Sequence, residues 1–307
     1  MNSTINRALI FQGGGSLGAY EAGAYKAIYE ALSEASRSEG RGNEPLFHIV
    51  SGTSIGAINA ALLVSYVKEN KTWEGSGERL VDFWEYLSTQ SSVERIPYFM
   101  HYWDSWRRVD RRIASGESAR RYFTTKEFIF KGVPNVFVPK TPLLDNRFFD
   151  PSNTWYIYDN KPLKESLEKF ARFPISTSFE KGEPRLLLVA VDVQEATPVV
   201  FDSYEKEDGT RKSEYGRLGR IKSDGSTKNP ENEAFEHVIR YDDGIKSDFV
   251  LASCSVPVNY DYTRLNVENR TLAVGGQYDN TAMGIIIGLL LLRTTVIACA
   301  FSGMVGY

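Results

Sequence analysis

Residues 46–64 read LFHIVSGTSIGAINAALLV, and this segment holds a strand signal, a turn signal and a helix signal in immediate succession. The apolar run Leu46 to Val50 is typical of a strand, and Ala57 to Val64 is typical of a helix. Between them lies Gly52-Thr53-Ser54-Ile55-Gly56, a G-x-S-x-G pattern. Glycines on both sides of the serine permit a sharp turn, so the pattern predicts a nucleophile elbow that exposes Ser54 Oγ at the helix N-terminus. The alternative is a chance match in a glycine-bearing loop, but the strand and helix on either side favour the functional interpretation.

A second strand-loop-helix signal precedes the elbow. Arg7 to Gln12 is a short, mainly apolar run ended by three glycines, and Tyr20 to Leu32 has helical spacing. Two such units in series predict an α/β fold with a mostly parallel sheet covered by helices.

The rest of the chain continues this alternation of helices and strands. Residues 78–87 and 163–170 have helical patterns, and 185–193 is the strongest strand signal, apolar enough for burial on both faces. Residues 198–202 are its expected partner, and the charged, glycine-bearing segment 204–233 is predicted to be a flexible surface insertion. Residues 102–123 combine arginines and tryptophans, which fits either phosphate headgroup binding or a solvated helix face.

Composition excludes several classes of protein. The net charge of -3 gives no general attraction to nucleic acid. The three histidines are scattered and form no metal-ligand motif, so no metal is expected. The two cysteines, Cys254 and Cys299, have no metal-ligand spacing and fit a reducing compartment, and the short polar start is not a secretory signal. We therefore expect a cytoplasmic protein.

A serine nucleophile also needs donors for the oxyanion that its attack creates. The segment Gly13-Gly14-Gly15-Ser16-Leu17-Gly18 follows a strand and opens a helix, where backbone N–H groups and the helix dipole stabilise negative charge. This G-x-G-x-x-G pattern is also the dinucleotide fingerprint. However, the next strand runs into the serine elbow instead of ending in the acidic residue that would bind a ribose, which argues against a nucleotide site.

Three segments together resemble the patatin-like phospholipase family. They are Gln12 to Tyr20 as the oxyanion loop, Gly52 to Ala57 as the elbow, and Ala252-Ser253-Cys254-Ser255-Val256-Pro257 as a later A-S-x-x-x-P segment. The resemblance implies a three-layer α/β/α fold and hydrolysis of lipid acyl esters by a Ser-Asp dyad, without histidine, metal or other cofactor. It also implies a lipid or acyl-ester substrate and contact with a membrane surface.

The resemblance implies a catalytic aspartate that this chain does not have at the matching position. In the family that aspartate begins an Asp-Gly-Gly or Asp-Gly-Ala turn, and the matching residues here are Ala273-Val274-Gly275-Gly276. Valine cannot accept a proton from Ser54. Asp279, a few residues further on, is the expected substitute, and Asp243 before Gly244 is interpreted as part of a surface turn. Either Asp279 completes the dyad or the chain is a degenerate, lipid-binding homologue.

The expected organisation is an acyl hydrolase domain over residues 1–282 followed by an apolar segment, 283–307. The only charge in this segment is Arg293, and its length approaches that of a membrane span. An arginine inside a span costs roughly 2.5 to 3.5 kcal/mol. The segment could thus be a membrane tail, a buried strand and helix, or a truncated or frame-altered end.

Overall fold

A computed structural model shows the fold of the chain over several separate ranges of residues. The residues described are 7–40, 42, 45–88, 132–133, 135–140, 156–192, 197–205, 212–215, 237–241, 243–256, 259–267 and 270–275. The arginine and tryptophan segment 102–123, Asp279 and the apolar segment 283–307 lie outside the described residues.

The two strand-loop-helix units predicted near the N-terminus are confirmed. The first comprises β1 (Ala8–Phe11), the short 3-10 helix η1 (Gly15–Leu17) and α1 (Gly18–Ser38). The second comprises β2 (Ile49–Thr53) and α2 (Ile55–Asn70). Strand β2 begins three residues later than the apolar run, because it is Ile49 that pairs with Ala8 and Arg185 in the sheet.

Helix α1 is longer than its apolar spacing predicts. It continues through a polar segment to Ser38 and ends where Gly40 adopts a left-handed φ of 72°. The last turn is exposed except for Ser36, so it needs no apolar stripe, and a glycine just past the helix end is a common stop signal. The glycine therefore marks the boundary better than the hydrophobic pattern does.

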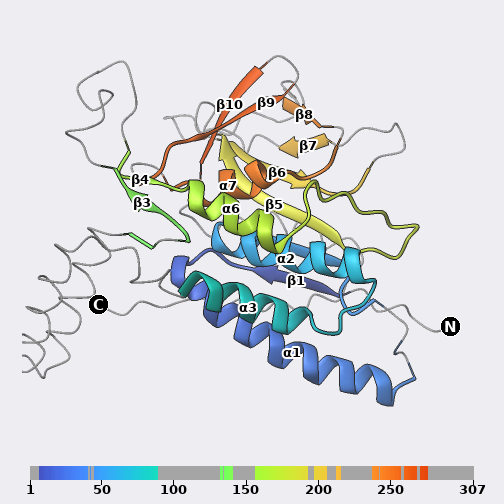
Figure 1. Ribbon diagram of the computed structural model, residues 1–307. Coiled ribbons are helices and arrows are strands. Elements are labelled where there is room, and N and C mark those ends of the chain that lie inside the picture. Colours follow the sequence, from blue (N-terminus) through green and yellow to red (C-terminus); the bar gives the residue numbers. More distant parts are fainter. Residues whose placement is uncertain are drawn as a thin grey trace, which may run out of the picture.

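The central sheet is mixed and has parallel strands at its core. Strand β2 pairs in parallel with both β1 and β5 (Arg185–Asp192), while β6 (Thr197–Asp202) pairs antiparallel with the other edge of β5. Two further antiparallel strands, β9 (Thr263–Val267) and β10 (Arg270–Gly275), complete it (Figure 1). The sheet order is β1-β2-β5-β10-β9.

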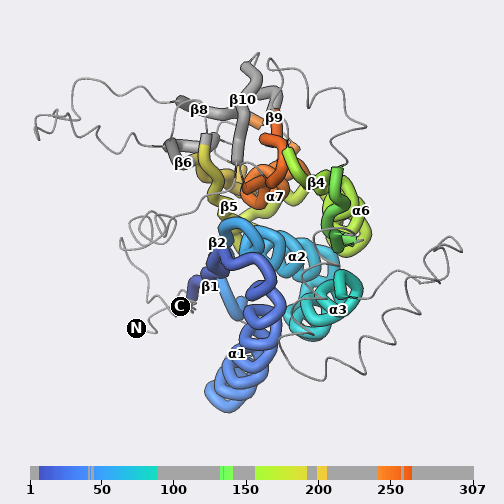
Figure 2. Tube along the Cα trace, turned by 90° about the vertical axis from the view of Figure 1, so that its left-hand side faces the viewer, coloured from blue at the N-terminus to red at the C-terminus, as the bar shows by residue number. Residues whose placement is uncertain are grey.

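Strand β5 is buried on both faces, as its continuous apolar run predicts. Leu186 and Leu188 join the large core under the helices, and Leu187 and Val189 join a smaller cluster on the opposite face with Ile10. The described helices lie on one side of β1, β2 and β5 (Figure 2). Besides α1 and α2, these helices are α3 (Ser76–Ser88), α6 (Lys161–Phe170) and α7 (Ser247–Cys254).

Helix α2 forms the centre of the large core. Its positions from Gly56 to Val67 are buried on nearly every side, which is typical of a helix enclosed by other elements. The described residues form the sheet and one helical layer of the expected three-layer α/β/α arrangement, and they bring the two N-terminal loops to the carboxyl ends of β1 and β2.

Two small antiparallel pairs lie outside the central sheet. They are β3 (Val138–Pro139) with β4 (Tyr158–Asp159), and β7 (Lys212–Tyr215) with β8 (His237–Arg240). The prediction of a flexible insertion over 204–233 is therefore wrong for β7. Backbone hydrogen bonds form this pair, and they need no apolar repeat in the sequence.

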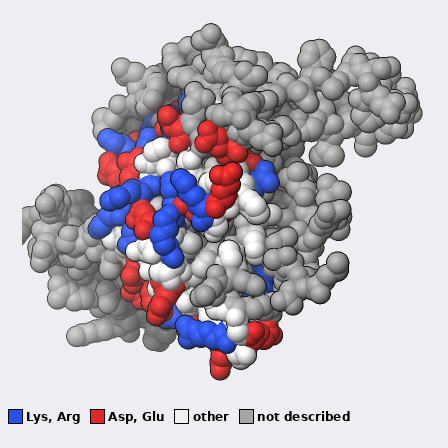
Figure 3. Space-filling view, turned by 90° about the vertical axis from the view of Figure 1, so that its right-hand side faces the viewer, with Lys and Arg blue, Asp and Glu red and all other residues white. Residues whose placement is uncertain are grey.

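Charges of both signs alternate on the surface. Figure 3 shows lysine and arginine side chains interleaved with aspartate and glutamate over the described part of one face. Several charged side chains of the described residues form ion pairs, such as Lys164 with Asp248 at 2.6 Å. Asp243, the residue assigned to a surface turn, pairs with Lys246 at 2.9 Å. Within the described segments, no helix combines the length and the apolar character needed to cross a membrane.

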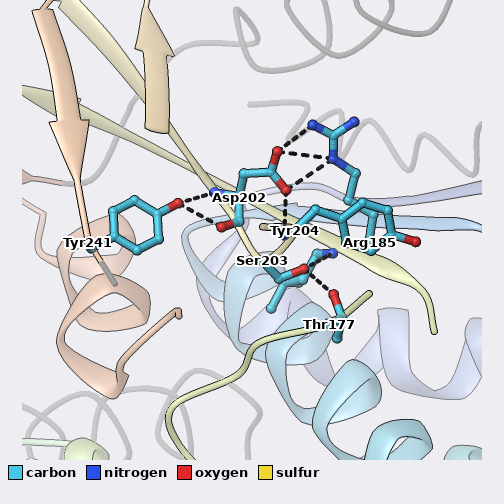
Figure 4. Close-up of polar contacts among 7 residues, drawn as sticks. Thr177, Arg185, Asp202, Ser203, Tyr204 and Tyr241 are labelled. Atoms are coloured by element: carbon cyan, nitrogen blue, oxygen red, sulfur yellow. Dashed lines mark hydrogen bonds and ion pairs between the residues drawn. The ribbon is translucent and has the colours of Figure 1, made fainter. Parts of the chain in front are cut away.

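A polar cluster joins the start of β5 to the end of β6 (Figure 4). The carboxylate of Asp202 accepts hydrogen bonds from the guanidinium of Arg185. The hydroxyl of Tyr241 accepts from the backbone N–H of Asp202 and donates to its carbonyl oxygen at 2.7 Å. Next to it, Ser203 Oγ accepts from the N–H of Leu186 at 2.8 Å. Strand β5, which neighbours the elbow strand, is thus fixed at its amino end.

Replacing Tyr241 by phenylalanine tests this cluster. The substitution leaves the buried N–H and carbonyl of Asp202 without the hydroxyl, so we expect the free energy of unfolding in urea to fall by about 1 to 3 kcal/mol. Tyr66→Phe is the matched control, because Tyr66 also donates to a backbone carbonyl, that of Glu74, but in an exposed position. Equal losses in the two variants would contradict a stabilising role for the cluster.

Candidate active site

Ser54 is held in a backbone conformation that residues other than glycine rarely adopt. Its φ is 54° and its ψ is -124°, and it is the N-cap residue of α2. Such a conformation costs on the order of 1 to 3 kcal/mol and persists only where surrounding structure enforces it. The half-buried Ser54 side chain therefore stands at the positive end of a long, buried helix.

The two glycines of the G-x-S-x-G pattern are required by close contacts between backbones. A Cβ atom on Gly52 would lie 2.1 Å from the carbonyl oxygen of Gly56, and one on Gly56 would lie 2.4 Å from the carbonyl oxygen of Phe11. No side chain fits at those distances. Strand β2 and helix α2 can therefore turn sharply at Ser54, and α2 can approach the end of β1.

Helix α7 holds both backbone polar groups of Ser54. The N–H of Ser54 donates to Ser253 Oγ at 2.8 Å, and Ser253 Oγ in turn donates to the carbonyl oxygen of Val189 at 2.5 Å. The thiol of Cys254 donates to the carbonyl oxygen of Ser54 at 2.9 Å. Burial raises the pKa of this thiol well above its usual range, which keeps the donated proton in place.

The glycine loop passes directly over the elbow. A Cβ atom on Gly13 would lie 3.2 Å from Ser54 Cβ and 4.0 Å from Ser54 Oγ. The residues that follow, Gly14, Gly15 and Ser16, are exposed and lead into the first turn of η1. Backbone N–H groups at such a position have no acceptor inside the helix that they begin. The structure thus brings the predicted loop and the predicted serine together.

The register of the sheet shows where Val274 lies. One edge of strand β5 pairs with β2 from Arg185 to Val189, and the other edge pairs with β6. Strand β10 pairs with β5 at Val191 and Asp192, where β6 already covers the second edge. Strand β10 therefore lies on the same edge of β5 as β2. It occupies that edge beyond the point where β2 ends at Thr53. The backbone of Val274, which pairs with Asp192, therefore follows the elbow along the same edge of β5.

Sequence reasoning missed a buried carboxylate beside this site. Glu21 of α1 is 6% exposed, and its oxygens accept from the N–H of Gln12 at 2.9 Å and from Asn59 Nδ2 at 3.1 Å. Burial raises its pKa to about 7, against the opposing effect of the hydrogen bonds from Asn59 and Gln12. The available signal was an acidic residue in the first turn of a helix, next to the small residues Ala22 and Gly23.

One of the comparisons with known proteins agrees with the motifs. The model of the family described as patatin-like phospholipase matches residues 9–287. No curated protein matches the chain. Among solved structures, the crystal structure of VipD from Legionella pneumophila is similar with 10% sequence identity and a TM-score of 0.29, over 88% of this chain and 45% of that one. The chain therefore spans less than half the length of VipD.

The contact between Ser253 and the elbow leads to a prediction about stability. Ser253→Ala leaves the Ser54 N–H without its acceptor and the Val189 carbonyl without the hydroxyl, so we expect unfolding in urea to require about 1 to 3 kcal/mol less. Ser38→Ala is the control, because Ser38 Oγ also donates to a backbone carbonyl but is exposed. If both variants lose the same small amount, Ser253 does not support the elbow.

Proposed function

The chain belongs to the patatin-like phospholipase family, and on that premise we propose that it is a serine hydrolase that cleaves carboxylic ester bonds of phospholipids or related lipids. The family membership supports lipid acyl hydrolysis in general. The serine mechanism is our own assignment, and the backbone of Ser54 is the observation that carries it. A strained serine at a helix N-terminus, beside a glycine loop, is an arrangement typical of serine acyl hydrolases.

In the proposed reaction, Ser54 Oγ attacks the carbonyl carbon of the ester. The carbonyl oxygen becomes an oxyanion, to which we assign the N–H groups of the loop Gly13, Gly14, Gly15 and Ser16 as donors. Collapse of the tetrahedral intermediate breaks the bond to the alcohol, which leaves with the proton taken from Ser54. Water then attacks the acyl-serine, and the free acid and the original hydroxyl are restored.

A general base must receive the Ser54 proton and return it to the leaving alcohol. We propose Asp279 for this role, because the position of the family aspartate is Val274. The reaction consumes only ester and water. We assign it to a domain over residues 1–282; the family match runs over residues 9–287.

An exposed apolar rim fits a lipid substrate. Leu17 is 45% exposed and Tyr20 is 61% exposed, and both lie next to the glycine loop. Large exposed apolar side chains beside a site favour contact with acyl chains or with a lipid surface. We therefore propose that the ester is taken from a membrane or micelle surface.

A second candidate function follows from the position of Val274. Its strand follows the elbow along the same edge of β5, so a valine there supports a lipid-binding homologue that lacks the dyad base. In that case Ser54 keeps its geometry and the ester remains uncleaved. The two candidates differ in whether any carboxylate reaches Ser54.

Substitution of Ser54 tests the main proposal. We expect Ser54→Ala to lower hydrolysis of a short-chain p-nitrophenyl ester by about 1000-fold or more and to abolish labelling by a fluorophosphonate probe. The control is Ser88→Ala, which removes an exposed hydroxyl at the end of α3. Activity equal to wild type in Ser54→Ala would exclude this residue as the nucleophile.

The two carboxylate positions distinguish the two candidates. If Asp279 is the base, Asp279→Asn lowers kcat about 100-fold or more, and Val274→Asp gives no gain. A degenerate homologue shows the opposite pattern: wild type is inactive toward the ester and the probe, and Val274→Asp creates activity. A fully active Asp279→Asn variant would exclude Asp279.

A further inference from the structure

Glu21 has no part in the proposed reaction, yet it lies between the two halves of the site. Its Oε1 accepts from the N–H of Gln12, the residue before the glycine loop, and its Oε2 accepts from Asn59, on the helix that Ser54 begins. Gln12 precedes Glu21 by nine residues, whereas Asn59 follows it by 38. A single buried carboxylate thus contacts the loop and the elbow helix at once.

Asn59 makes two further hydrogen bonds, one to the start of α1 and one to α3. Its Nδ2 also donates to the carbonyl oxygen of Gly18 at 3.0 Å, and its Oδ1 accepts from Trp84 Nε1 of α3 at 2.9 Å. Asn59 is fully buried. Each polar atom of the Asn59 amide therefore has a partner, which fixes the orientation of the amide and leaves one N–H directed at Glu21.

The position of Gln12 makes this network relevant to catalysis. The next residue, Gly13, passes over Ser54. A Cβ atom on Gly13 would lie 3.2 Å from Ser54 Cβ. A shift of the Gln12 backbone therefore moves the proposed oxyanion donors relative to Ser54 Oγ. Misplacement by about 1 Å can cost roughly 100-fold in rate.

We infer that Glu21 is a positioning residue, which sets the glycine loop relative to Ser54 by accepting hydrogen bonds from Gln12 and Asn59 together. The effect of this role on catalysis rests on the proposed function. The hydrogen bonds themselves exist whether or not the protein is active, so an experiment can test them separately from the activity.

An ionised carboxylate suits this position better than a protonated carboxyl group or an amide does. Two N–H donors face its two oxygens, so an ionised Glu21 accepts from both, whereas protonation of one oxygen weakens one of the two bonds. An amide at the same place would turn an NH₂ group toward an N–H donor. The ionised form is therefore the one that holds the loop and the elbow helix together.

The protonation state of Glu21 changes near neutral pH, because burial raises its pKa to about 7. Gln12, Asn59 and Trp84, which form the network around it, carry no acidic or basic group. On α1, Tyr25 lies one turn further, and burial raises its pKa far above neutrality. Lys26 of α1 pairs with Glu78 of α3 at 3.1 Å.

The sign of the pH effect differs between activity and stability. Rising pH through about 7 ionises Glu21 and completes the network, so the rate should rise. The folded state holds the proton of Glu21 more tightly than the unfolded chain does, because the pKa of Glu21 is raised from 4.5 to about 7 on folding. The protonated carboxyl therefore contributes to the free energy of unfolding in full below pH 4.5, and this contribution is lost as the pH rises through about 7.

The kinetic test compares Glu21→Gln and Glu21→Ala with the control Glu34→Gln, an exposed glutamate on the same helix. We expect kcat to fall about 10-fold in Glu21→Gln and about 100-fold in Glu21→Ala, with KM within about 3-fold of wild type. The rise of kcat with pH near 7 should be absent from Glu21→Gln. A folded Glu21→Ala variant with wild-type kcat would overturn the positioning role.

A second measurement works without any enzymatic activity and uses wild-type protein with three folded variants. The chain has four glutamines, at positions 12, 90, 194 and 277, so labelling with ¹⁵N-glutamine gives four backbone amide resonances, and Gln12→Asn identifies that of Gln12. We expect the Gln12 resonance to titrate with a midpoint near pH 7 in wild type and in Glu34→Gln, and to lose this titration in Glu21→Gln.

The two measurements separate failure of the inference from failure of the proposed function. A Gln12 resonance that titrates in an inactive wild type would retain the network and reject the hydrolase. A Gln12 resonance that ignores pH between 5 and 9, or that titrates unchanged in Glu21→Gln, would reject the contact with Glu21 even in an active enzyme.

Discussion

The backbone of Ser54 is the constraint on which the other features of the site depend. A left-handed φ at a serine is unfavourable, and here it is enforced from three directions. Gly52 and Gly56 let the backbones of β2, α2 and β1 approach to distances that exclude any side chain. Helix α7 binds the N–H and the carbonyl of Ser54 through Ser253 and Cys254. The sheet, the elbow helix and α7 must therefore all be in place before the serine is presented.

The site contains two locally unfavourable features that the surrounding core stabilises. The strained turn and the buried Glu21 each destabilise the folded state, and both lie beside α2, the most deeply buried helix of the described core. Cores of this kind can support such costs, because burial of each large apolar side chain contributes roughly 1.5 to 3 kcal/mol. In this account, ionisation of Glu21 lowers the stability of the folded state and aligns the glycine loop with Ser54. This trade between stability and activity is common at functional sites.

The sequence predicted those parts of the structure that local pattern determines. The elbow follows from two glycines around one serine, and the burial of β5 on both faces follows from an apolar run without alternation, as in Leu186 to Val189. Contacts between distant residues carry no such pattern. Ser253 lies 199 residues from Ser54 in the chain, and Glu21 lies 38 residues from Asn59, so neither contact could be found from spacing. The A-S-x-x-x-P segment was noticed, but its role as a support for the elbow needed the tertiary fold.

The most direct test of this account is the crystal structure of the protein after reaction with a short-chain phosphonate ester, whose tetrahedral phosphorus imitates the intermediate. The account predicts a covalent bond from Ser54 Oγ to phosphorus, with the phosphoryl oxygen within about 3 Å of backbone N–H groups of the glycine loop. Phosphorus bonded to another residue, or a phosphoryl oxygen directed away from Gly14 and Gly15, would contradict it.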